Sequence, residues 1–288
     1  MVYLLPVFER LSRRRLYRKG MRSVAVPTPE GRLHSYEGRG DSAGPPMVML
    51  HGIGSSATAY AALLARLRPH ASVLWAPDLP GHGFSDPVVG EPRFEELYQR
   101  VARAIDARFD APFVLIGTSL GGGLALRYAI ERPEKVARLV LCSPAGAQMS
   151  DAAFAQLKHT FRMDRRTAGV EFVDRLFDRP PVYRRLLGRE VRHLLGRPLV
   201  QRLVHNAGPE DFLSAEEVAG LQPPTLLLWG TEERLLPEEC LDWFRQYLPG
   251  HVQIERPAGF GHSAHLERPA QLARRIVEFI DGASGELS

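Results

Sequence analysis

The chain has 288 residues, of which 44% are hydrophobic and 24% charged, a composition typical of a globular protein large enough to bury one substantial core. Residues 1–23 hold seven basic side chains and one acidic one, a local charge of +6, so the rest of the chain carries −2 of the formal +4. This distribution excludes a nucleic-acid footprint on the folded body, and the two cysteines exclude a disulfide-rich scaffold. With no apolar stretch of roughly 18 residues and no signal-peptide pattern, we expect a cytoplasmic protein.

After the basic segment, short apolar runs alternate with segments of helical period along most of the chain. Residues 23–26 and 32–37 flank a turn-rich stretch and predict an antiparallel hairpin. The alternation that follows predicts a mostly parallel sheet flanked by helices, an α/β fold. Its expected strands are residues 47–50, 72–76, 113–116, 139–142, 225–229 and 251–255.

One connection is much longer than the others. About 80 residues separate the strand ending at Cys142 from the one starting at Thr225, far more than a crossover needs. Apolar residues recur there at helical spacing among many arginines, which predicts a helical cap inserted after the sixth strand. We therefore expect a basic N-terminal segment (residues 1–22), a core (23–146 and 216–288) and a cap (147–215).

A Gly-x-Ser-x-Gly pattern stands between an expected strand and an expected helix. The strand 113–116 leads into Gly117-Thr118-Ser119-Leu120-Gly121, followed by a helical stretch from Leu124. A serine on so sharp a turn has strained backbone and an exposed Oγ, and its glycines avoid collisions with the neighbouring strand and helix. Ser119 is the predicted nucleophile. A phosphate-binding turn is disfavoured because the Lys-Ser/Thr ending is missing.

A nucleophilic serine needs a base and an acid in the chain order Ser, acid, His. His262 follows the last expected strand and is the predicted base, whereas His265 fits the start of the next helix. Two glutamates follow the preceding strand. We choose Glu233 as the acid and keep Glu232 as its competitor.

Two backbone N–H groups are needed to bind the oxyanion of a tetrahedral intermediate. Leu120, directly after the nucleophile, supplies the first. The second comes from the loop after strand 47–50, where we name Ile53, with Gly54 as the alternative. The scattered histidines and cysteines show no metal-ligand spacing, and no dinucleotide signature is present, so neither a metal nor a cofactor is expected.

Five ordered motifs together resemble the α/β-hydrolase superfamily over residues 23–281. They are His51-Gly52, residues 78–85, residues 117–122, residues 229–237 and Gly261-His262. Residues 141–146, the basic lead-in and the cap are similar to the monoacylglycerol lipase-like and lipase/esterase branch. The resemblance implies the triad and oxyanion roles given above, although Glu233 stands where an aspartate is commonest in the family.

Three functions compete on this evidence. The first is hydrolysis of a small-molecule apolar ester, such as an acylglycerol, through an acyl-enzyme, which the apolar cap favours. The second is carbon–carbon bond hydrolysis of ring-cleavage products with the same triad, which the fold alone does not separate from the first. The third is a non-enzymatic ligand receptor or scaffold, which the intact motifs disfavour. A dehalogenase or epoxide hydrolase would need an aspartate in place of Ser119.

The N-terminal segment has two interpretations. Apolar residues from Val2 to Leu11 precede the arginines, so residues 1–22 suit peripheral contact with an anionic membrane. The alternative is a helix packed on the body or cap with its arginines in solvent, and the sequence favours this second interpretation.

Overall fold

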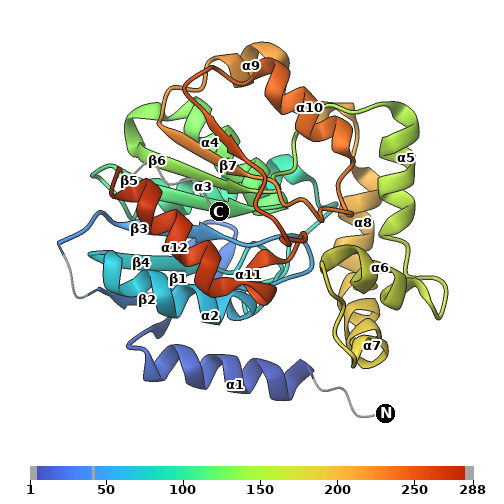
Figure 1. The fold of residues 1–288 in the computed structure, drawn as a ribbon. Helices are drawn as coiled ribbons and strands as arrows, with labels where there is room; N and C mark the ends of the chain where they lie inside the picture. Colours follow the sequence, from blue (N-terminus) through green and yellow to red (C-terminus); the bar gives the residue numbers. More distant parts are fainter. Residues whose placement is uncertain (1–4, 41–42, 283–288) are drawn as a thin grey trace.

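An eight-stranded sheet forms the middle layer of the computed structural model, which describes residues 5–40 and 43–282 (Figure 1). The strand order is β1-β2-β4-β3-β5-β6-β7-β8, with β2 antiparallel to both β1 and β4 and every other neighbouring pair parallel. The strands are β1 (Arg22–Thr28), β2 (Gly31–Arg39), β3 (Met47–Leu50), β4 (Val73–Pro77), β5 (Phe113–Thr118), β6 (Val136–Cys142), β7 (Thr225–Leu228) and β8 (Gln253–Glu255). The predicted hairpin and parallel sheet are confirmed. The last strand begins two residues later than predicted, because His251 and Val252 complete a turn.

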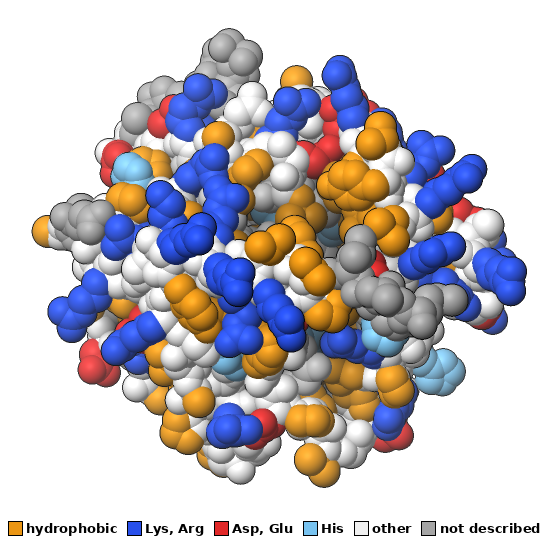
Figure 2. Space-filling view, turned by 90° about the horizontal axis from the view of Figure 1, so that it is seen from below, with side chains coloured by type: hydrophobic (Ala, Val, Ile, Leu, Met, Phe, Trp, Pro, Cys, Tyr) orange, Lys and Arg blue, Asp and Glu red, His pale blue; other side chains and the backbone are white. Residues whose placement is uncertain are grey.

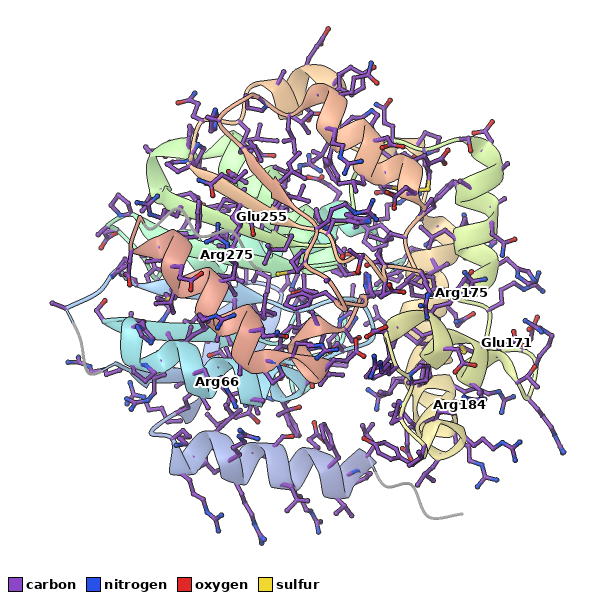
Figure 3. The ribbon with its side chains drawn as sticks, viewed as in Figure 1. Arg66, Glu171, Arg175, Arg184, Glu255 and Arg275 are labelled. Atoms are coloured by element: carbon purple, nitrogen blue, oxygen red, sulfur yellow. The ribbon has the colours of Figure 1, made fainter. Side chains whose placement is uncertain are left out.

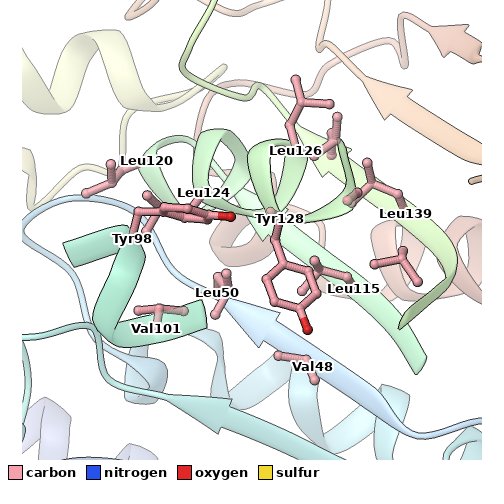
Figure 4. Close-up of a cluster of buried hydrophobic side chains, with 14 of the residues drawn as sticks. Val48, Leu50, Tyr98, Val101, Leu115, Leu120, Leu124, Leu126, Tyr128 and Leu139 are labelled. Carbon is pink, nitrogen blue, oxygen red and sulfur yellow. The ribbon is translucent and has the colours of Figure 1, made fainter. Parts of the chain in front are cut away.

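The central strands are apolar throughout because helices cover both faces of the sheet. In β3, Val48 and Leu50 belong to the core on one face, while Met47 and Met49 belong to the core on the other. This alternation follows from the period of two along a strand. Figure 4 shows part of the first core, where side chains of β3, β5 and β6 meet those of α3 and α4.

The helices divide between the two faces of the sheet. The first core includes side chains of α3, α4 and α10, and the second includes side chains of α1, α2 and α12. The helices of the body are α1 (Leu5–Arg18), α2 (Ala61–Leu67), α3 (Phe94–Asp106), α4 (Leu120–Glu131), α10 (Glu238–Tyr247), α11 (Ala264–Glu267) and α12 (Pro269–Ile280). Helix α3 ends at Asp106, and Phe109, three residues further on, is buried in the first core.

The predicted helical insertion lies between β6 and β7. It contains α5 (Asp151–Thr160), α6 (Ala168–Leu176), α7 (Arg184–Leu195), α8 (Pro198–Asn206) and α9 (Ala215–Ala219), and Figure 1 shows α5 to α8 standing at one end of the sheet. A separate apolar cluster joins α5 to α8 to one another and to the loop after β7, including Phe161, Phe172 and Leu235. None of the helices in the described ranges combines the length and the apolar content that crossing a membrane requires.

The register of the parallel strands determines which loops meet. Leu50 pairs with Gly117, Thr118 with Cys142, and Leu228 with both Cys142 and Glu255. The segments that leave β3, β5, β6, β7 and β8 therefore emerge side by side at the carboxyl edge of the sheet, where open α/β sheets bind ligands.

Three histidines are buried beneath these loops, with exposed fractions of 1% for His51, 3% for His82 and 7% for His265. Burial, which disfavours the charged imidazolium, lowers the pKa of His82 to about 4 and that of His265 to about 3, and nearby histidines add to both shifts. Burial also lowers the pKa of His51. His265 stacks on Tyr60 with ring centroids 3.9 Å apart.

These histidines should make the fold sensitive to acid. Below a pH of about 6.5 the unfolded chain takes up protons that the folded chain does not bind until pH 4 or lower, so the free energy of unfolding falls as the pH drops through this window. Each histidine adds a slope of about 1.4 kcal/mol per pH unit. Urea unfolding of the wild type and His265→Gln between pH 7.5 and 5, in steps of about half a pH unit, should show a shallower slope for the variant. Equal slopes would contradict the lowered pKa of His265. The loss of its stacking on Tyr60 lowers the stability at every pH and so does not change the slope.

Candidate active site

Ser119 occupies the sharp turn between β5 and α4 with φ 55° and ψ −122°, a conformation that non-glycine residues rarely adopt. Backbone hydrogen bonds hold it there. Its N–H donates to Cys142 O over 3.1 Å, and its carbonyl accepts from the N–H groups of Gly123 and Ala145, each over 3.0 Å. The strain is therefore held by the neighbouring strand β6 and by the first turn of α4.

Two glycines make this turn sterically possible. A Cβ on Gly117 would stand 2.3 Å from Gly121 O, and one on Gly121 would stand 2.4 Å from Leu50 O. Neither distance is compatible with a side chain, since these backbone atoms belong to packed elements. The structure thus confirms that a side chain at either position would collide with the neighbouring strand or helix.

The loop after β3 passes close to Ser119. A Cβ on Gly52 would lie 3.2 Å from Ser119 Cβ and 3.7 Å from Ser119 Oγ. The next residue, Ile53, lines the same cavity as Ser119 and Leu120, and no described acceptor takes its backbone N–H. Leu120 is the first residue of α4, so its N–H has no partner within the helix. Both predicted oxyanion donors thus lie around the cavity that Ser119 borders.

His51 holds this loop in place by two hydrogen bonds. Its Nε2 accepts from Leu79 N–H over 2.9 Å, and its Nδ1 donates to Gly52 O over 2.8 Å. Asp78, which is fully buried, accepts from the N–H groups of Ala57 and Phe84. These contacts stabilise the loops around the site and leave neither side chain facing the cavity.

His262 and Glu233 form a buried pair. His262 Nδ1 donates to Glu233 Oε2 over 2.7 Å, and the two side chains are 6% and 0% exposed. The other carboxylate oxygen, Oε1, accepts from the N–H groups of Leu235 and Leu236 over 2.8 and 3.0 Å. Burial acts to raise the pKa of Glu233, but His262, Ser143 and the Leu236 N–H together hold that pKa below its ordinary value.

Glu232 takes a different direction from its neighbour. It pairs with Arg234, and its side chain is 34% exposed. Its backbone N–H donates to Phe260 O over 3.0 Å, which orients the turn. Of the two glutamates that the sequence left in competition, Glu233 is the one that reaches His262.

Ser143 is a residue of the site to which the sequence reasoning gave no role. It directly follows β6, is 3% exposed, and has φ 41°. Its N–H donates to Leu228 O over 2.9 Å, and its side chain helps to lower the pKa of Glu233. The sequence held one signal for this role. Ser143 follows β6, the strand that lies between β5, which leads to Ser119, and β7, which leads to Glu233.

The segment at the end of α6 holds both loops that carry this pair. Leu176 O accepts from Ser263 N–H over 2.9 Å, next to His262. Arg175, labelled in Figure 3, donates from Nη1 to Arg234 O over 3.1 Å, next to Glu233. On the opposite side, Arg275 of α12 makes a bidentate ion pair with Glu255 of β8, seen in the same view. The acid and base loops are thus fixed from the cap and from the body.

Ser119 opens onto an apolar cavity of about 150 Å³ between the body and the cap. The residues that line it come mainly from α4, α5 and the segments around them, and the apolar ones include Ile53, Leu124, Met149, Phe154, Leu157, Phe161, Val204 and Leu213. Charged side chains border the cavity at Arg127, Lys158 and Asp211. Such a lining suits a mostly apolar ligand.

Within the described ranges, no hydrogen bond joins Ser119 Oγ, of the predicted nucleophile, to His262, the predicted base. Catalytic hydrogen bonds often tighten only when substrate is present. Among residues 5–40 and 43–282, no group of three His, Cys, Asp or Glu side chains is arranged to hold a metal ion.

Known proteins resemble this chain over most of its length. The pimeloyl-[acyl-carrier protein] methyl ester esterase of Chromobacterium violaceum is 30% identical over 83% of this chain and 95% of its own. Human monoacylglycerol lipase ABHD6 is 27% identical over 82% of this chain and 75% of its own. The 2-hydroxy-6-oxononadienedioate/2-hydroxy-6-oxononatrienedioate hydrolase of Cupriavidus pinatubonensis is 26% identical over 81% and 86%.

Solved structures share the fold. A membrane phospholipase A described as a bacterial virulence factor superposes with a TM-score of 0.80 at 23% identity, over 97% of this chain and 93% of its own. The model of the alpha/beta hydrolase family matches residues 47–275, which include every site residue described above. The chain therefore belongs to the alpha/beta hydrolase family.

Proposed function

We propose that this protein hydrolyses carboxylic esters of apolar acids through an acyl-enzyme, with Ser119, His262 and Glu233 as its triad. The observation that carries the proposal is the buried hydrogen bond between His262 and Glu233, at the sheet edge from which the strained Ser119 faces an apolar cavity. A fully buried carboxylate that accepts an imidazole N–H is suited to orient a base and to stabilise its imidazolium.

The chemistry follows from these positions. Ser119 Oγ attacks the ester carbonyl carbon, and its proton moves to His262 Nε2, while Glu233 stabilises the resulting imidazolium. The backbone N–H groups of Ile53 and Leu120 receive the negative charge that forms on the carbonyl oxygen. As the C–O bond breaks, His262 returns the proton to the departing alcohol. Water then repeats the sequence on the acyl-enzyme and releases the acid.

The cavity supports an acylglycerol or a similar apolar ester as substrate. Phe154, Leu157 and Phe161 lie along its cap side and Leu124 along its body side, so an acyl chain would be surrounded by carbon. Monoacylglycerols are the substrates named for the human relative, which is consistent with this class.

One observation favours carbon–carbon bond hydrolysis as the second candidate. The dienedioate in the name of the Cupriavidus relative carries two carboxylates, which a cation in the cavity would bind. Lys158 borders the cavity and donates to two carbonyls, His205 O and Ala207 O, both over 2.9 Å. Arg127 is less suited, because Glu95 and Glu131 already neutralise it. The apolar lining outweighs this single cation, and the ester remains our first choice.

We also infer that residues 1–22 make peripheral contact with a membrane, which would hold the enzyme beside a lipid substrate. Their local charge of +6 supports this proposal, since anionic lipid attracts basic segments near its surface.

The triad predicts a characteristic pattern of losses. Ser119→Ala and His262→Ala should each lower kcat for a p-nitrophenyl ester by about 10⁴ to 10⁶, and the double variant should be hardly worse, because the residues act as one unit. Steady-state rates of the three variants test this. Losses that add up in the double variant would refute a shared mechanism, and a wild type that resists a fluorophosphonate probe would refute a nucleophilic Ser119.

The acid is tested by two adjacent glutamates that form a matched pair. Glu233→Gln should lower kcat by about 10³ to 10⁴, because the amide no longer stabilises the imidazolium. Glu232→Gln, which removes only the exposed pair with Arg234, should change it by less than about tenfold. The kcat values of the two variants identify the acid. A larger loss for Glu232→Gln than for Glu233→Gln would assign that role to Glu232.

Substrate choice should follow the cavity. We expect kcat/KM to rise from acetate to medium or long acyl chains, since each buried methylene contributes about 0.8 kcal/mol. A panel of p-nitrophenyl esters from acetate to palmitate, a monoacylglycerol and a dienone acid measures this. A maximum at acetate would remove the main support for a lipase-like substrate, and faster turnover of the dienone acid would establish the second candidate instead.

A further inference from the structure

Helix α1 lies along one edge of the body and contacts it through a narrow face (Figure 1). Leu16 is fully buried and Ser12 is 8% exposed, and the helix packs against α2. Arg13 reaches inward, with its guanidinium 4.6 Å from the Phe84 ring centroid. The segment thus forms a helix that packs on the body, but it packs through Ser12, Arg13 and Leu16 and not through the apolar residues from Val7 to Leu11, which are left to the solvent.

The outward face of α1 is apolar at its start and basic at its end. Val7, Leu11, Arg14 and Arg18 follow one another at spacings of four, three and four residues, so they form one stripe along the helix. Val7 is 51% exposed, Leu11 58%, and the flanking Phe8 51%. Monomeric proteins rarely leave such residues together on a helix without a partner.

The basic residues of this surface are not neutralised. Within the described part of the chain, no ion pair involves any of the exposed residues Arg10, Arg14, Arg15, Arg18 and Lys19. Glu9, the one acidic residue of α1, is half-buried on the inner side, where burial raises its pKa. The outward face thus carries positive charge beside apolar side chains, and Figure 2 shows this mixture of blue and orange on the side seen from below.

The cap continues this surface. Leu5 N–H, at the start of α1, donates over 3.2 Å to Oε2 of Glu190, a buried residue of α7. Tyr183 and Leu186 precede Glu190 by seven and four residues and so share its side of α7. They are 61% and 36% exposed, and the adjoining Val182 is fully exposed. Exposed apolar residues of the cap thus lie within about two helical turns of Glu190, the residue of α7 that bonds to the start of α1.

We propose that α1 and the start of α7 form one lipid-facing surface, which docks on an anionic bilayer with its apolar residues in the interface and its basic residues over the headgroups. This inference rests on the peripheral contact proposed for residues 1–22 and extends it to the cap. Apolar side chains beside unpaired cations are complementary to a bilayer that offers acyl chains below a layer of negative charge. The Leu5–Glu190 hydrogen bond holds the two parts of the surface in one position.

Vesicle sedimentation of the full-length protein tests the surface. We expect binding to phosphatidylglycerol vesicles at low salt, weaker binding at high salt, and little binding to phosphatidylcholine. The variants V7S/L11S and R14Q/R18Q should each weaken partitioning by about tenfold or more, and Y183S/L186S should weaken it measurably. The control V89S/R245Q changes an exposed valine and an exposed arginine outside α1 and α7, and it should bind as the wild type does.

Hydrolysis of a short soluble ester, measured on the same samples, separates this inference from the proposed activity. All four variants should keep the wild-type rate, because none of the changed residues borders the cavity; an inactive wild type that still binds vesicles would refute only the ester hydrolase. No phosphatidylglycerol binding, or equal binding by the α1 variants and the wild type, overturns the surface. Unchanged binding by Y183S/L186S overturns the part assigned to α7. If the wild type does not bind vesicles but forms a dimer that V7S/L11S dissociates, the outward face of α1 instead contacts a second copy of this chain.

Discussion

The left-handed backbone of Ser119 is the constraint on which the rest of the site depends. A serine at φ 55° is stable only where its surroundings over-determine it, and here β6, α4 and the loop after β3 all do so. The same arrangement requires glycine at 117 and 121 and brings Gly52 to within contact of the serine. The strand, the helix and the loop after β3 therefore together hold this one strained residue in place.

Glu233 bonds both to His262 and to the backbone of its own turn. Its carboxylate reaches His262 with one oxygen while the other accepts two backbone N–H groups of the same turn. A buried carboxylate is costly unless it is fully hydrogen-bonded, and these donors together with Ser143 meet that requirement. The turn after β7 therefore carries this carboxylate and also donates two of its hydrogen bonds.

The sequence was sufficient to predict what depends on local pattern, and insufficient for what depends on contacts between distant residues. Strand periodicity and the Gly-x-Ser-x-Gly turn predicted the sheet and the place of Ser119, because both signals lie within a few residues. Spacing favoured Glu233 over Glu232 as the acid, but the direction of each side chain, which spacing does not encode, is known only from the structure. Ser143 and the Leu5–Glu190 bond escaped notice for the same reason, since the latter joins residues 185 positions apart. Helix α1 has one packed face and one exposed face, and membrane contact of residues 1–22 stays a prediction.

The cap lies between the proposed membrane surface and the loops that carry His262 and Glu233. Helix α7, held to α1 by Glu190, packs closely on α6, where Gly169 and Gly188 leave no room for a side chain between the helices. The end of α6 in turn bonds to the backbone beside His262 and beside Glu233. Two packed helices, α7 and α6, thus lie between α1 and the loops that carry His262 and Glu233.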